Sequence, residues 1–116
     1  MTITLEKIKN HRNSTTVADI RGMKIGLRLL SGDEYLSAAT GCVSEVKAFL
    51  EKHGADLRHR VTLDLMFREL MTQVIAIVAF DPENNQPVFN CPQDVREEIA
   101  GADRNTLIEC YQALEQ

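Results

Sequence analysis

Residues 61–80 read VTLDLMFRELMTQVIAIVAF, a stretch with helical spacing of apolar positions that is too long for an ordinary strand. Its first half alternates charged and apolar residues, whereas the run from Leu70 to Phe80 carries no charge. This pattern predicts one helix whose second half is the buried spine of the domain. The uncharged run is well short of the ~20 residues that cross a membrane, so we interpret it as a core helix.

The ends of this helix also have sequence signals. Thr62 is a candidate N-cap, and Asp64 and Arg68 have the i,i+4 spacing of a helical ion pair. Asp81-Pro82 is expected to end the helix because proline cannot continue the hydrogen-bond ladder. Residues 83–86 then read as a turn, and residues 87–89 as an extended return.

A second helix is predicted upstream. The sequence Ser31-Gly32-Asp33-Glu34 has the pattern of a capping box, with Ser31 as the N-cap and Glu34 reaching back to it. Thr40-Gly41 weakens the middle of this helix and allows a kink or a break, and Gly54 is the expected C-cap. Spacings of three and four predict a buried stripe made of Tyr35, Leu36, Ala39, Val43, Val46, Phe49 and Leu50.

The first thirty residues leave several alternatives open. Residues 2–10 read as a short helix or as a frayed strand, and residues 11–16 read as a polar loop. Residues 24–29 alternate strictly, which predicts a strand with Ile25, Leu27 and Leu29 on one face. Its partner is either residues 17–21, with Gly22-Met23 as the turn, or a strand from another copy of the chain.

Two short helices are expected after the turn. Pro92 suits the first turn of one of them, with Asn90 or Cys91 as its cap and Gly101 closing it. Asp103 is the predicted cap of the terminal helix, whose apolar stripe is Leu107, Ile108, Tyr111 and Leu114. The predicted fold class is therefore mainly α: a small single domain over residues 17–116, with four or five helices and a minor N-terminal strand or hairpin. A basic arm, which can be flexible, covers residues 1–16.

Composition supports one small soluble domain. The 116 residues are 44% hydrophobic but contain no Trp, so an aliphatic core with methionine as filler is expected. Three cysteines without CxxC spacing argue against a disulfide framework or a zinc site. No secretory leader pattern opens the chain.

Charge is divided unevenly along the chain. Residues 1–30 carry a net charge of +4 and residues 31–116 carry −8, which gives the total of −4. A basic head on an acidic body argues against the whole domain following a nucleic-acid backbone. It is compatible with head-to-tail self-association, and equally with an ordinary solvated surface.

The sequence offers little for catalysis. It has no glycine-rich phosphate loop and no nucleophile elbow, and its histidines have no metal-type spacing. An enzyme would need a polar pocket converging on His53 or His59. We therefore predict a protein that is not an enzyme, without catalytic residues, cofactor or metal.

Methionines suggest a binding surface instead. Met66 and Met71 lie with Phe67 and Leu70 on the helix of residues 61–80. Either these methionines fill gaps in the core, or they belong to a groove that accepts varied apolar partners. On the second interpretation, the candidate partner-binding residues are Met66, Phe67, Leu70, Met71, Leu107 and Tyr111.

Residues 77–99, IVAFDPENNQPVFNCPQDVREEI, followed by a terminal helix ending in YQALEQ, resemble the tail assembly chaperones of long-tailed bacteriophages. That family combines an apolar helix, a turn of the type D-x-(D/E)-(N/G)-x-P-(L/V)-F, a short acidic helix and a final Leu/Tyr helix. Residues 19–38, DIRGMKIGLRLLSGDEYLSA, resemble its strand followed by an acidic helix. The resemblance extends over residues 17–116, whereas residues 1–16 and Thr40-Gly41 match nothing in it.

This resemblance implies a function. Such proteins bind the aggregation-prone tape-measure protein in many copies, without a nucleotide, and keep it soluble until tail-tube subunits polymerise around it. It implies the tape-measure protein as a partner, and the tail-tube protein directly or through a longer frameshift product. It also implies a place in the host bacterial cytoplasm rather than in the mature virion. Self-association is expected, whereas nucleic acid and membranes are not expected partners.

One alternative function belongs to another class. A small acidic regulatory or inhibitor protein would use a clustered face to bind a basic protein surface. The residues that would form this face are Asp94, Glu97, Glu98 and Asp103.

Overall fold

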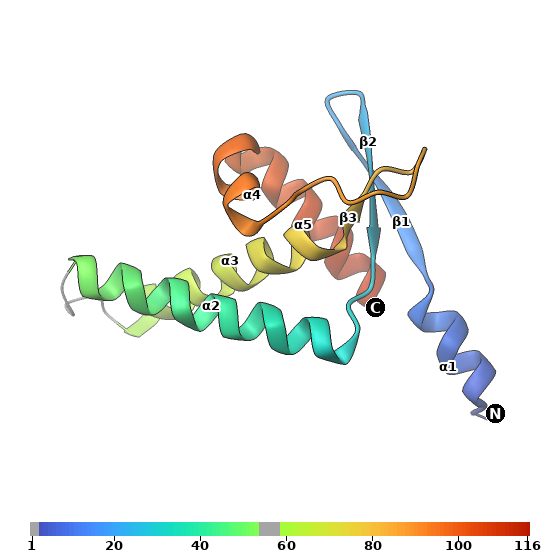
Figure 1. Cartoon of the computed structure of the whole chain (residues 1–116), viewed down its shortest axis with the longest axis horizontal. Coiled ribbons are helices and arrows are strands. Elements are labelled where there is room, and N and C mark those ends of the chain that lie inside the picture. The colour runs from blue at the N-terminus through green and yellow to red at the C-terminus, as the bar shows by residue number, and fades with distance from the viewer. Residues whose placement is uncertain (1–2, 54–58) are drawn as a thin grey trace.

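A computed structural model describes residues 3–53 and 59–116 of the chain, and the side chains of residues 53 and 59–61 lie outside the described part. The described residues form five helices around one small sheet (Figure 1). In chain order the elements are α1 (Leu5–Arg12), β1 (Thr15–Ile20), β2 (Met23–Arg28), α2 (Gly32–His53), α3 (His59–Val78), β3 (Ala79–Phe80), α4 (Pro92–Glu98) and α5 (Gly101–Glu115). The predicted mainly α fold with an N-terminal hairpin is confirmed.

Residues 5–12 form a helix, which decides between the two alternatives for the N-terminal segment. The Thr4 hydroxyl accepts a hydrogen bond from the Lys7 backbone N–H at 3.2 Å and caps α1. The prediction of a loop over residues 11–16 is mostly wrong, because α1 continues to Arg12 and β1 starts at Thr15. Only Asn13 and Ser14 connect the two elements, since β1 must pair along its full length with β2.

The strand partner comes from the same chain. β1 pairs antiparallel with β2, and β3 adds to the other edge of β2 in the order β1-β2-β3. The turn falls at Arg21 and Gly22, one residue earlier than predicted, and both residues have positive φ. The Gly22 backbone N–H donates to Asp19 Oδ1 at 2.8 Å and fixes this turn. Ile25 and Leu27 are buried as expected, whereas Leu29 lies beyond the strand and is partly buried.

The capping box of α2 is confirmed in both directions. The Glu34 backbone N–H donates to Ser31 Oγ at 3.2 Å, and the Ser31 backbone N–H donates to Glu34 Oε1 at 2.9 Å. Glu34 also accepts two hydrogen bonds from the Arg28 guanidinium, each at 2.7 Å. Arg28 further donates to the Ile77 carbonyl at 3.3 Å, so this ion pair joins β2, α2 and α3.

This ion pair predicts a pH dependence of stability. Hydrogen bonds from Arg28 lower the pKa of Glu34 from 4.5 to about 2. Because the pKa is lower in the folded state, the ion pair stabilises the fold fully above pH 4.5 and loses this effect as the pH falls towards 2. Glu34→Gln is expected to cost about 1–2 kcal/mol of unfolding free energy at pH 7. Urea denaturation of both proteins at pH 7 and at pH 2.5 checks this. If the difference in unfolding free energy between the two proteins is the same at pH 7 and at pH 2.5, the ion pair does not have the assigned role.

The buried face of α2 differs from the predicted stripe. Ala38, Cys42 and Val46 are buried, whereas Tyr35, Leu36, Val43 and Phe49 of the predicted stripe are exposed. Of that stripe, only Val46 is buried, and Ala39 and Leu50 are partly buried. The reason is close packing on α3, which selects the small residues of α2 rather than its large ones.

Gly41 belongs to this close packing and does not break α2. The helix runs without interruption from Gly32 to His53. A Cβ at position 41 would lie 2.5 Å from Gln73 Oε1 of α3, so a larger residue there would require the Gln73 side chain to move. One residue further, the Cys42 thiol donates to the Met66 carbonyl at 3.1 Å. The C-cap predicted at Gly54 lies outside the described residues.

Helix α3 provides the expected spine. Residues 71–76 are all buried, and they run through the centre of the molecule. Two details are corrected: Thr62 lies inside α3 rather than at its cap, and the helix ends at Val78 because β3 leaves it to pair with β2. The Asp64–Arg68 pair is not among the ion pairs of the described residues.

The segment after β3 forms the predicted turn. The Asp81 backbone N–H donates to the Gln86 carbonyl at 2.9 Å, and Asn85 has a φ of 59°. Pro87 forms a bridge with Phe80, and the return brings Phe89 into the core. Cys91 is the N-cap residue of α4, with Pro92 in the first turn.

The boundary between α4 and α5 is also corrected. Helix α4 ends at Glu98 rather than at Gly101, and α5 begins at Gly101 with Ala100 as its N-cap residue. Asp103, the predicted cap, lies in the first turn of α5, where its carboxylate accepts a hydrogen bond from Arg21 at 3.0 Å. This ion pair connects α5 to the end of β1.

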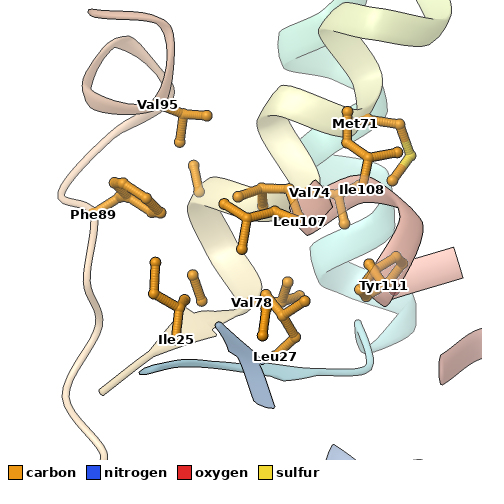
Figure 2. Packing of buried hydrophobic residues seen from close by; sticks show 14 of the residues in the cluster. Ile25, Leu27, Met71, Val74, Val78, Phe89, Val95, Leu107, Ile108 and Tyr111 are labelled. Atoms are coloured by element: carbon orange, nitrogen blue, oxygen red, sulfur yellow. The ribbon is translucent and has the colours of Figure 1, made fainter. Parts of the chain in front are cut away.

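The core lies where α3 and α5 pack on one face of the sheet. Figure 2 shows side chains from β2, α3, α5 and the segment around α4 converging on one cluster. Leu27, Ile75 and Leu107 are its largest fully buried members. The Tyr111 hydroxyl accepts a hydrogen bond from the Leu30 backbone N–H at 3.3 Å, so even the polar edge of the core is paired.

Candidate functional site

The α2–α3 hairpin exposes large apolar side chains along its length. It extends from the sheet and α5 towards one end of the molecule (Figure 1). Phe67 is 49% exposed and Met66 is 36% exposed. The further exposed apolar side chains of this hairpin include Tyr35, Leu36, Val43, Phe49 and Leu63. Apolar side chains exposed singly are common on protein surfaces, so the hollows that some of them line are the better indication of a binding site.

One hollow in this region has an apolar lining. We call it the α2–α3 cleft; its volume is about 310 Å³ and it lies between α2, α3, α4 and α5. The residues that line it are Glu45, Val46, Phe49, Leu65, Arg68, Glu69, Thr72, Arg96 and Arg104. Its apolar side chains come from α2 and α3, whereas α4 and α5 contribute only arginine. The cleft therefore combines an apolar lining with a charged rim.

Arginine 96 organises the rim of the α2–α3 cleft. The Arg96 guanidinium forms two hydrogen bonds with the Glu69 carboxylate, one of them from Nε at 3.2 Å. The same guanidinium lies 3.9 Å from Glu45, so one side chain from α4 pairs with carboxylates on both α2 and α3. The hydrogen bond to Glu69 raises the pKa of Arg96 above its ordinary value. This network holds the short helix α4 against the hairpin.

Arginine 104 is less completely satisfied. Its Nη2 donates to the Arg96 carbonyl at 3.2 Å, whereas its buried Nε has no acceptor among the described residues. Arg68, which is exposed, lines the same cleft from α3. An apolar ligand that also carries a hydrogen-bond acceptor would therefore fit this cleft better than a purely apolar one.

A second hollow lies between α3 and α5. We call it the α3–α5 hollow; its volume is about 340 Å³, and it adjoins the α2–α3 cleft at Arg68. The residues that line it are Asp64, Phe67, Arg68, Asn105, Ile108, Glu109 and Gln112. It has a more polar lining than the first hollow, with two carboxylates beside an exposed aromatic ring.

The structure separates the six residues predicted as a partner-binding surface. Met66 and Phe67 are exposed on α3, and Leu70 is partly buried against the core. Met71, Leu107 and Tyr111 are buried in the core, so they support the fold instead of presenting a surface (Figure 2). Burial of Met71 agrees with the interpretation of that methionine as core filler.

The sequence did not single out Val46, Phe49 and Leu65 as a site. Val46 and Phe49 belonged to the stripe expected to pack inside the domain, and Leu65 lay among the alternating positions of the next helix. The only sequence signal was an excess of apolar positions on the helix of residues 32–53, more than one packed face can bury.

Other chemistry is sparse in the described part of the chain. None of the described helices is long and apolar enough to cross a membrane. No cluster of three or more described His, Cys, Asp or Glu side chains has a geometry that could hold a metal ion. His11 is exposed, and the side chains of His53 and His59 lie outside the described residues.

Comparison with solved structures gives a match across most of the chain. The structure of the bacteriophage HK97 tail assembly chaperone superimposes with a TM-score of 0.55, covering 85% of this chain and 83% of that chain. The two chains share a fold. Their sequence identity is 16%, so the similarity lies in the arrangement of elements more than in individual residues. The sequence matches no protein-family model and no curated protein. The fold expected from the sequence resemblance to tail assembly chaperones is thus confirmed.

Proposed function

We propose that this protein is a phage tail assembly chaperone that binds the tape-measure protein and keeps it soluble during tail assembly. The shared fold with the HK97 tail assembly chaperone carries this proposal. The resemblance of residues 77–99 to the sequence pattern of this family also supports it. Arg96, in the short helix α4 of this segment, lines the α2–α3 cleft.

The α2–α3 cleft suggests how a client would bind. A large apolar side chain of a client helix would insert between Val46, Phe49 and Leu65. An oxygen acceptor on the client would pair with the exposed guanidinium of Arg68, which lines the same cleft. One such contact is weak, and many copies along a long client would make the assembly strong.

The acidic surface supplies solubility in this account. Each copy carries a net charge of −4, with −8 on residues 31–116, so a client covered by many copies gains negative charge. The action is stoichiometric and involves no catalysis, cofactor or nucleotide. The proposed place of action is the host cytoplasm, before the virion is complete. Tail-tube subunits would join the covered client, directly or through a longer frameshift product.

Co-expression tests the proposal. The tape-measure protein encoded beside this chain should be mostly insoluble when expressed alone and mostly soluble when expressed with it. Quantitative gels of the soluble and pelleted fractions measure the change. An equally insoluble tape-measure protein in both cultures would overturn the proposal.

The alternative of an acidic inhibitor receives less support from the structure. Asp94 accepts a hydrogen bond from the Asn90 backbone N–H, Glu97 accepts one from Gln93, and Asp103 pairs with Arg21. Three of the four carboxylates of the expected acidic face therefore already have partners within the chain.

A further inference from the structure

Helix α1 has apolar side chains that its own chain does not cover. None of its eight residues is buried. Leu5 is 66% exposed and Ile8 is 55% exposed, and Ile3, just before the helix, is 79% exposed. Isolated helices shorter than ~12–15 residues are only marginally stable in water. A second surface that covers α1 would therefore stabilise it.

One face of α1 combines apolar and basic groups. Leu5, Ile8 and Arg12 follow the i, i+3, i+7 spacing that places side chains on one face of a helix. Lys9 and His11 flank this face, whereas Glu6 and Asn10 lie on the opposite side. A matching surface must therefore be partly apolar and mainly acidic.

The α3–α5 hollow has these properties. Phe67 offers a half-exposed ring and Ile108 the apolar floor beside it. The exposed carboxylates of Asp64 and Glu109 line the same hollow and outnumber its one guanidinium, that of Arg68. Opposite charges on the two surfaces would guide the helix and set its orientation.

The connection to β1 prevents α1 from reaching the hollow of its own chain. Asn13 and Ser14 alone join the two elements, and two residues span at most ~7 Å. Figure 1 shows α1 leaving the start of β1 and projecting away from α3 and α5. Docking of α1 in the hollow of its own chain is therefore excluded as long as β1 stays paired.

We propose that α1 of one copy docks in the α3–α5 hollow of a second copy. The donor helix and the receiving hollow are different surfaces, so the contact is head-to-tail and each copy can both donate and receive. Repetition of this contact produces a chain or a ring of copies. The proposal concerns the protein alone and does not depend on the chaperone function or on any client.

Charge reversal tests the contact on the full chain. Light scattering after size exclusion at low salt should show wild-type species several times heavier than the 13.0 kDa monomer. The donor variant Lys9→Glu with Arg12→Glu and the receiver variant Asp64→Lys with Glu109→Lys should each elute as a monomer. An equimolar mixture of the two variants should recover the heavy species, because each variant then meets a partner of opposite charge.

Two further variants separate this contact from general charge effects. Lys47→Glu with Lys52→Glu makes the same charge change as the donor variant on exposed positions of α2, and should leave the wild-type mass unchanged. Ile8→Asp should weaken self-association at least tenfold, while circular dichroism shows a folded protein because α1 has no buried residue. A monomeric wild type at every concentration, or a mixture that stays monomeric, would overturn the proposal.

Discussion

Replacing Phe49 with aspartate is expected to return most of the co-expressed tape-measure protein to the insoluble fraction. Phe49 lines the α2–α3 cleft and is 40% exposed, so its ring contributes apolar surface that an incoming side chain would cover. A carboxylate at this position places a charge where the client must lose its water, which costs about 2 kcal/mol or more per contact. Because many copies act on one client, the loss at each copy accumulates along its length.

Leu36→Asp is the matched control for this prediction. Leu36 is 64% exposed on the same helix and does not line the α2–α3 cleft. Both variants introduce one carboxylate at an exposed apolar position of α2, and the melting temperature of each shows whether the fold is intact. If the Phe49→Asp protein keeps its client as soluble as the wild type does, the α2–α3 cleft does not bind the client.

Leu107→Ala should lower the free energy of unfolding by about 3 kcal/mol, within the range of 2–5 kcal/mol found for buried leucines. Leu107 is fully buried on α5 and packs with residues of β2 and α3 (Figure 2). Removing its side chain leaves a cavity at the point where the helices meet the sheet. A loss of about 3 kcal/mol is a large part of the total unfolding free energy of a domain of this size.

Urea denaturation at pH 7 measures this effect. Leu36→Ala is the control, because Leu36 is 64% exposed and its truncation should change the unfolding free energy by less than ~0.5 kcal/mol. Similar values for the two variants would mean that α5 is not part of the cooperative core.

The elements with local signals were predictable from the sequence. The capping box at Ser31 and Glu34, the alternation around Ile25 and the uncharged run after Leu70 each specify their structure through neighbouring residues. The hairpin and the spine of α3 are confirmed for this reason.

Packing between distant segments was not predictable in the same way. The sequence marks Gly41 as a weak point of a helix, and only the structure shows that α3 approaches so closely that a Cβ there would meet the Gln73 side chain. The same close approach buries Ala38 and Cys42 and turns Val43 and Phe49 outwards. Periodicity alone favours the large residues, because it contains no information on the distance between helices.

The candidate site depends on this same packing. Phe49 was expected inside the domain and Tyr111 on a surface, and the structure reverses the two. Arg96 and Arg104 line the α2–α3 cleft only because α4 and α5 pack against the hairpin. No local pattern connects residues so far apart in the chain. Met66 and Phe67, however, lie on a surface as the sequence suggested.

The composition of the complex with the tape-measure protein is the decisive measurement of whether this chain binds that client. The two proteins are co-expressed with an affinity tag on the tape-measure protein, purified, and analysed by size exclusion with light scattering and quantitative amino-acid analysis. A soluble complex with several copies of this chain on each tape-measure protein is the predicted result. A purified tape-measure protein that carries none of this chain, in an extract where both are soluble, would contradict the account.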